Sequence, residues 1–306
     1  EPDEETLTAL FRELEFDSLI DRLGLVGEDT PEGDGTTDED PALEFDFGPY
    51  EEVQALDADS VDYDVVQNRG ELEAFAERLA QQDRYAFDTE TTSKDPMYAA
   101  LVGLSFSWAV EEATYVPTPL PDGTDTDAVL DVLAPVLDAD TTKVGHNLKY
   151  DLLVLRRHGV DVDGALVDTM VGHYLLSPEE NHNLDDVARS VLNYKMVPIS
   201  DLIGDGKEEE SMRDVAVEEA APYACEDADI ALRLADALEE RLAEDELLEI
   251  AEDMEFPLVR VLAEMEHLGI RVDTDVLDEI SSGLEEKLNE IESEIYQLAG
   301  EVFNIN

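Results

Sequence analysis

Between residues 65 and 247, short apolar runs alternate with longer amphipathic runs along the chain. The short runs have the length and composition of strands at 84–88, 101–108, 113–116 and 143–145. The spacing of the apolar residues predicts helices at 71–82, 127–137, 148–158, 168–176, 184–192 and 223–242. Strands that alternate with helices favour an α/β domain with a mixed central sheet flanked by helices.

The segments on either side of this region have different patterns. Apolar residues recur about once per helical turn in 4–23, which predicts one amphipathic helix or two short ones within residues 1–27. Between Arg22 and Arg69 there is no basic residue while 15 acidic residues accumulate, so 28–64 is interpreted as a self-repelling acidic linker, with a regulatory tail as the alternative. Residues 248–306 are predicted to start a second, helical unit, with helices at 256–268 and 276–299.

The charge balance by itself argues against a polyanionic partner. The 306 residues carry 79 acidic and 19 basic side chains, a formal net charge of −60, although 43% hydrophobic residues are enough for a real core. Such a surface repels nucleic acid and anionic membranes at long range unless metal ions or salt intervene. One cysteine, Cys225, cannot form an intrachain disulfide, and there is no signal peptide or apolar run of membrane-spanning length, so we expect a cytoplasmic protein without membrane contact.

Three groups of polar residues stand at positions where chemistry is expected. Asp88 and Glu90 are two residues apart on a predicted strand, so their side chains share one face. Asp151 follows a strand-to-helix junction. Tyr223 and Asp227 are four residues apart on a predicted helix and also share a face. Alternatively, these residues have no functional role, with Tyr223 a core aromatic residue and Asp227 a solvated charge. The neighbouring Glu226 and Asp229 are interpreted in this second way, as residues without a functional role.

The order of these groups resembles the four-carboxylate 3′–5′ exonuclease superfamily, in its tyrosine-containing branch. The resemblance is closer still to the proofreading exonuclease domain of the family A bacterial DNA polymerases, and segments 87–91, 101–106, 145–151 and 223–229 carry it. It implies an RNase H-like exonuclease fold for residues 65–247. Segment 1–14 resembles the part that follows the 5′-nuclease domain in that family, and 255–259, 267–272 and 299–306 resemble the start of the polymerase domain and its thumb helices.

This wider resemblance implies that the chain is a fragment with the rest of a polymerase in cis. The sequence has no initiator Met and stops before any palm residues, so we expect that it cannot synthesise DNA by itself. The implied partner is a single-stranded DNA 3′ end or a frayed primer terminus. We further expect a monomer, associated with the nucleoid.

The resemblance also implies roles for the five polar residues. Hydrolysis of a phosphodiester at neutral pH needs an activated water and stabilisation of charge on two oxygens, which two divalent ions can supply, and oxygen ligands suit Mg²⁺ or Mn²⁺. Asp88, Glu90 and Asp227 would hold the ion that activates water, with Asp88 bridging. Asp151 would serve the second ion, partly through water, and Tyr223 would orient the attacking water.

Residues that contact substrate are also implied by the match. Thr91 and Asn147 stand where the family contacts the 3′-terminal nucleotide, and Tyr150 is a plausible helper. Lys94 departs from the family, which usually has an apolar residue there. Lys94 is then either a phosphate contact, with Met97 and Ile199 supplying the apolar contact, or an exposed loop lysine.

Two other functions remain open at this point. An RNase D-like exoribonuclease shares the carboxylate pattern, although the sequence after residue 268 argues against it. A catalytically silent module that supports a polymerase would keep the fold without using metal. The five histidines show no metal-ligand spacing. Because acidic residues are spread through all segments and lysines number only six, the composition resembles that of proteins from salt-accumulating halophiles.

Overall fold

The computed structural model describes residues 53–57, 60–204 and 210–305. The chain divides into two compact units, 1–51 and 52–306, and only the second is described here. The predicted helix at 4–23, the whole of segment 1–27 and most of the predicted linker therefore lie outside the described residues. No helix in the described part of the chain is both long enough and apolar enough to cross a membrane.

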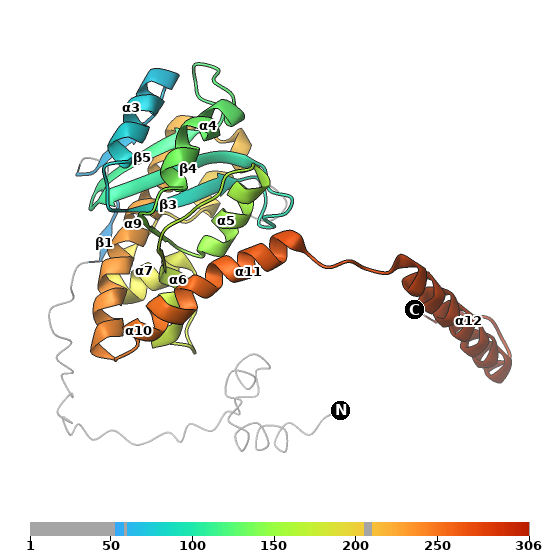
Figure 1. Cartoon of the computed structure of the whole chain (residues 1–306). Coiled ribbons are helices and arrows are strands. Elements are labelled where there is room, and N and C mark those ends of the chain that lie inside the picture. Colours follow the sequence, from blue (N-terminus) through green and yellow to red (C-terminus); the bar gives the residue numbers. More distant parts are fainter. Residues whose placement is uncertain (1–52, 58–59, 205–209, 306) are drawn as a thin grey trace, which may run out of the picture. The chain divides into compact units, whose positions relative to one another are not determined.

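A six-stranded mixed sheet forms the centre of the described unit (Figure 1). Its strands run in the spatial order β2-β5-β4-β3-β6-β7. Their bounds are β2 Asp62–Val65, β3 Arg84–Thr91, β4 Leu101–Ala109, β5 Glu112–Pro117, β6 Thr142–Gly145 and β7 Leu166–Asp168. The central pairs β3–β4 and β4–β5 are antiparallel, and β2–β5, β3–β6 and β6–β7 are parallel. This is the mixed α/β sheet that the sequence predicts.

Helices cover both faces of the sheet. They are α3 Arg69–Leu79, α4 Thr126–Leu137, α5 Leu148–Arg157, α6 Thr169–Leu176, α7 Leu184–Leu192, α8 Ser200–Ile203 and α9 Val217–Glu244. A single 3₁₀ turn, η2, spans Met212–Asp214. The expected helices at 71–82, 127–137, 148–158, 168–176 and 184–192 all exist with ends that differ by at most three residues, whereas α9 starts six residues earlier than expected.

The alternation of side chains along β3 decides which residues meet which layer. Tyr85 and Phe87 are buried in the larger core cluster, which includes residues of α3, α4 and α5. Ala86 faces the opposite way and packs with Ala231 and Ala235 of α9. Because side chains alternate along a strand, Asp88 and Glu90 share the α9 side with Ala86.

The structure differs from the sequence prediction at several short strands. Strand β7 has three residues, and β1 Gln54–Ala55 and β8 Tyr194–Lys195 have two each, too few for a recognisable alternation. β1 pairs with β8, and β2 pairs with β5 in the main sheet. Parts of the segment expected to be a linker, 54–55 and 62–64, are therefore paired with strands of the folded unit.

The chain after α9 continues as helices, as expected. Its elements are α10 Leu248–Ile250, the π-helical turn η3 Ala251–Glu255, α11 Phe256–Leu268 and α12 Thr274–Ala299. Val259 and Ala263 of α11 are buried in the larger core cluster, so this helix packs on the same core as the sheet. No residue of α12 is buried, and its apolar side chains Leu277, Ile280, Leu284, Leu288 and Ile291 are exposed.

Candidate active site

Three carboxylates from two distant parts of the sequence meet at the sheet. Asp88 and Glu90 come from β3, and Asp227 comes from α9. One carboxylate oxygen of each residue lies within 4.8 Å of one from each of the others. Three hard anionic ligands so close together form a set that suits Mg²⁺ or Mn²⁺.

Helix α9 brings Tyr223 and Asp227 to the same cavity because they are one turn apart. The part of α9 around these residues is rich in small buried side chains, which are Ala220, Ala221, Ala224, Cys225 and Ala228. Small side chains let the helix lie close to the strands beneath it. Cys225 is one of these core residues, and its thiol is buried.

Asp151 lies beside the three-carboxylate cluster, in the first turn of α5. Its side chain is 2% exposed, and its Oδ1 accepts hydrogen bonds from Thr89 N at 3.0 Å and Thr89 Oγ1 at 2.6 Å. Thr89 is between Asp88 and Glu90 on β3, so the strand that carries these two carboxylates also anchors Asp151. Asp151 lines the same cavity but is not among the three carboxylates within 4.8 Å.

Burial raises the pKa of all four carboxylates, and the charge of Asp88 raises it further in the other three. Burial raises the pKa of Asp88 to about 6. Burial followed by the charge of Asp88 raises the pKa of Glu90, Asp151 and Asp227 well above their usual values. Glu90 Oε1 is buried and has no hydrogen-bond partner among the described residues. A buried oxygen without a donor, next to two other carboxylates, fits a metal ligand.

The Tyr223 hydroxyl keeps its proton in this environment. Burial raises the pKa of Tyr223, and the charges of Asp227, Glu90 and Asp88 raise it further. At neutral pH Tyr223 therefore offers an O–H donor at the edge of the cluster.

A cavity of about 680 Å³ opens over the carboxylates. Its lining contains every residue expected from the sequence except Met97: Asp88, Glu90, Thr91, Lys94, Asn147, Tyr150, Asp151, Ile199, Tyr223 and Asp227. The hydroxyls of Thr91 and Tyr150 are hydrogen-bonded to each other, and both contact the Ser93 carbonyl oxygen. The structure therefore brings together all but one of the predicted residues.

Met97 is the residue that the structure does not bring to the cavity. It lies in the loop after β3, is 39% exposed, and donates its backbone N–H to Asp95 Oδ1 at 2.9 Å. Ile199, at the start of α8, lines the cavity and is 41% exposed. Of the two apolar side chains expected near the substrate, only Ile199 is in place.

Asp168 is a site-supporting residue that the sequence analysis missed. This buried carboxylate is on the last residue of β7 and accepts four backbone hydrogen bonds, from Asn147, Leu148, Met170 and Val171, at 2.8 to 3.3 Å. Asn147 has a left-handed backbone (φ 62°), which asparagine tolerates better than most residues. Asp168 thus holds the turn that starts α5 and, one turn later, presents Asp151. The sequence does show an aspartate at the start of a predicted helix, where it can accept hydrogen bonds from Met170 and Val171. Its other partners, Asn147 and Leu148, are at least 20 residues away, so no local pattern indicates them.

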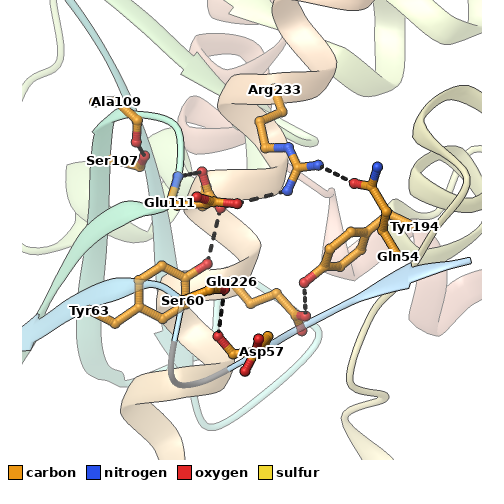
Figure 2. Close-up of polar contacts among 11 residues, drawn as sticks. Gln54, Asp57, Ser60, Tyr63, Ser107, Ala109, Glu111, Tyr194, Glu226 and Arg233 are labelled. Carbon is orange, nitrogen blue, oxygen red and sulfur yellow. Dashed lines mark hydrogen bonds and ion pairs between the residues drawn. The ribbon is translucent and has the colours of Figure 1, made fainter.

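The expectation that Glu226 and Asp229 are ordinary solvated charges is wrong. Glu226 is 0% exposed and Asp229 is 1% exposed. Neither residue lines the cavity, and both have defined partners on other elements. Figure 2 shows the hydrogen bond between Glu226 and Tyr194. Their positions along α9 predicted a face different from that of Asp227, but not that this face is buried.

Comparisons with known proteins agree with this geometry. A sequence model described as "3'-5' exonuclease" matches residues 63–243. DNA polymerase I of Pseudomonas aeruginosa is 38% identical over 100% of the chain, which covers 33% of that protein. DNA polymerase I of Chloroflexus aurantiacus is 35% identical over 99% of the chain, which covers 34% of that protein. The chain thus spans about a third of the length of these relatives.

Solved structures share the fold. The POL domain of Pol1 from M. smegmatis, in a complex with DNA primer-template and dNTP, superimposes with a TM-score of 0.61 at 25% identity, covering 79% of this chain and 38% of the other. Brucella melitensis NrnC superimposes with a TM-score of 0.54 at 20% identity, covering 69% of this chain and 94% of the other. The described unit has the RNase H-like exonuclease fold that the family resemblance implies. The chain belongs to the DNA polymerase I family, and residues 63–243 are its 3′–5′ exonuclease domain.

Proposed function

We propose that this domain removes the 3′-terminal nucleotide from single-stranded DNA with the help of two divalent ions, Mg²⁺ or Mn²⁺. The observation that carries the proposal is the meeting of Asp88, Glu90 and Asp227 within 4.8 Å at the base of an open cavity. The polymerase relatives support DNA as the substrate.

The chain's own residues divide the work as follows. Asp88, Glu90 and Asp227 would hold the first ion, and Asp88, the most accessible of the three, would be shared with the second. Asp151 would serve the second ion through water, because Thr89 already occupies its Oδ1. Bound ions would lower the pKa of an attacking water and offset charge on the leaving oxygen. Tyr223 would hold that water through its protonated hydroxyl.

The cavity wall would hold the substrate. The joined hydroxyls of Thr91 and Tyr150, together with Asn147, would receive the terminal nucleotide, and Ile199 would contact a base. Lys94 lines the cavity, which supports a contact from its ammonium group to a phosphate. In an acidic protein such a contact would retain the substrate end close to the carboxylates.

DNA and RNA oligonucleotides of the same sequence separate this function from that of an RNase D-like enzyme. With a 5′ label and Mn²⁺, the single-stranded DNA is expected to shorten from its 3′ end, one nucleotide at a time, and faster than the RNA. Faster degradation of the RNA would support the exoribonuclease. Absence of degradation of either strand, in a protein that melts cooperatively, would support the silent supporting module.

The relatives support a longer polymerase in cis, which would deliver a frayed primer terminus to this cavity. A cytoplasmic, nucleoid-associated monomer is the corresponding cellular form. Helix α12 lies in the region that resembles the start of the polymerase domain, and its apolar residues are exposed. This supports a longer protein in which further parts of the polymerase cover them. These assignments rest on the family and not on the geometry of the cavity.

We also propose that the net charge of −60 reflects a cytoplasm rich in salt. At about 0.1 M salt, exposed charges still repel one another over roughly 10 Å, whereas at about 1 M this range falls to roughly 3 Å. The melting temperature is therefore expected to rise by at least about 5 °C between 0.1 M and 2 M KCl, corresponding to roughly 2 kcal/mol. Melting temperatures that stay constant or fall over this range would contradict the proposal.

A further inference from the structure

Two buried carboxylates flank the metal-ligand candidate Asp227 on α9 without facing the cavity. Glu226 precedes Asp227 by one residue, and Asp229 follows it by two. Since successive helical residues are about 100° apart around the axis, both project from a different side of α9 than Tyr223 and Asp227. Two charged groups buried without a catalytic contact need another explanation.

The Asp229 carboxylate is engaged through both oxygens. The Tyr63 hydroxyl of β2 donates to Oδ2 at 3.1 Å, and the Glu111 backbone N–H donates to Oδ1 at 2.9 Å. Glu111 is in the tight turn between β4 and β5 and has a left-handed backbone (φ 65°). The Arg233 guanidinium lies 4.0 Å from Oδ2. Asp229 thus ties α9 to the edge strand β2 and to the turn that leads into β5.

The Glu226 carboxylate is held in the same way on the other flank. The Tyr194 hydroxyl of β8 donates to Oε1 at 2.8 Å, and the Val197 backbone N–H donates to Oε2 at 2.9 Å. Arg233 connects the two flanks, because it lies over the Tyr194 ring at 5.1 Å and donates to Gln54 Oε1 at 3.1 Å (Figure 2). Gln54 belongs to β1, the strand that pairs with β8.

The rest of this helix segment offers few directional contacts. The buried face near Asp227 consists mainly of alanines, whose methyl groups pack closely but fix rotation weakly. Hydrogen bonds to carboxylates are directional and stronger than those between neutral groups. In addition, Asp227 repels Asp88 and Glu90, so it needs a firm hold in order to stay within 4.8 Å of them.

We propose that Glu226 and Asp229 are positioning residues that fix the rotation of α9 about its axis and thereby place the Asp227 carboxylate and the Tyr223 hydroxyl at the metal site. This inference rests on the proposed exonuclease function. It also gives a role to Gln54 and Tyr63, which lie at or before the start of the family match at residue 63. Outer partners of metal ligands commonly change metal affinity or activity by about 10- to 100-fold when replaced.

The test measures Mn²⁺ activation of DNA degradation in Asp229→Asn, Glu226→Gln, Tyr63→Phe and Tyr194→Phe. The Mn²⁺ concentration that gives half of the maximal rate is expected to rise about tenfold in each carboxylate variant and less in the phenylalanine variants. The KM for the oligonucleotide should stay within about twofold, because none of these residues lines the cavity. Saturating Mn²⁺ should restore much of the rate in Asp229→Asn, whereas it should not in Asp227→Asn.

A matched control separates positioning from a general loss of stability. Glu239→Gln makes the same carboxylate-to-amide change on α9 and removes an ion pair to Arg84 of 2.7 Å, far along the helix from the cavity. It should lower the melting temperature without changing the Mn²⁺ requirement. If the four variants behave like Glu239→Gln, the inference is wrong.

Two further outcomes are a carboxylate variant that does not fold and an unmodified protein that shows no activity. If Asp229→Asn does not fold, the single hydroxyl deletions Tyr63→Phe and Tyr194→Phe decide, and a normal Mn²⁺ requirement in both overturns the inference. If the unmodified protein shows no Mn²⁺-dependent degradation, the proposed function itself fails, which is a distinct result from a normal Mn²⁺ requirement in active variants.

Discussion

Replacing Asp227 by Asn is expected to lower the rate of nucleotide release by about a thousandfold or more, a loss of roughly 4 kcal/mol of transition-state stabilisation. The change keeps the size of the side chain but removes one of three anionic ligands within 4.8 Å of one another. The measurement is single-turnover degradation of a 5′-labelled single strand at saturating Mn²⁺.

The same substitution should stabilise the metal-free protein. Asp227 is buried beside Asp88 and Glu90, and the charge on Asp227 is costly there, as its raised pKa indicates. An amide removes this cost, so a gain of about 1 kcal/mol or more, or about 2–4 °C in melting temperature, is expected at pH 8. Glu239→Gln is again the control, and it should lose stability and keep its activity. An active Asp227→Asn variant would refute the assigned role of Asp227.

The second large effect is a stabilisation by Mn²⁺ that grows as the pH rises from 5 to 8. A concentration of 100 times the dissociation constant contributes about 2.7 kcal/mol, which corresponds to roughly 5–10 °C in melting temperature. Protons compete with the metal for the carboxylates, so the increment should be small at pH 5. Differential scanning calorimetry in 2 M KCl measures it while salt screens weak binding to the acidic surface.

For the metal-free protein, the direction of the pKa shifts determines whether the free energy of unfolding rises or falls with pH. Folding raises the pKa of Asp88 from about 4 to about 6, so the folded state binds more protons in this window than the unfolded state. The free energy of unfolding should therefore fall as the pH rises from about 4 through 6, and further where Glu90, Asp151 and Asp227 lose their protons. Asp88→Asn should weaken both the stabilisation by Mn²⁺ and the fall in the free energy of unfolding with rising pH. An increment that is independent of pH, or equal in this variant, would contradict the account.

The parts of the site that are local in sequence were predictable. Asp88 and Glu90 follow from strand alternation, and Tyr223 and Asp227 follow from helical spacing. The family resemblance was needed to distinguish these functional residues from the other acidic residues, because an Asp-x-Glu pair is common in a chain with 79 acidic side chains. The predicted fold class is confirmed, since the alternation of short apolar runs with longer amphipathic runs is enough to indicate an α/β domain.

The remaining features depend on contacts between distant residues. Tyr63 and Asp229 are 166 residues apart, and Tyr194 and Glu226 are 32 apart, so no local pattern indicates that these carboxylates are buried. Strands β1 and β8 have two residues each and exist only as a pair. Met97 failed as a cavity residue because the turn formed with Asp95 places it elsewhere.

The central claim is that Asp88, Glu90 and Asp227 form a metal site. It is tested most directly by calorimetric titration of Mn²⁺ into the metal-free protein in 2 M KCl at pH 8, with the double variant Asp88→Ala/Glu90→Ala as the reference. The account predicts saturable binding at stoichiometric amounts of Mn²⁺ in the unmodified protein and its loss in the folded double variant. Equal heats in the two proteins would contradict it.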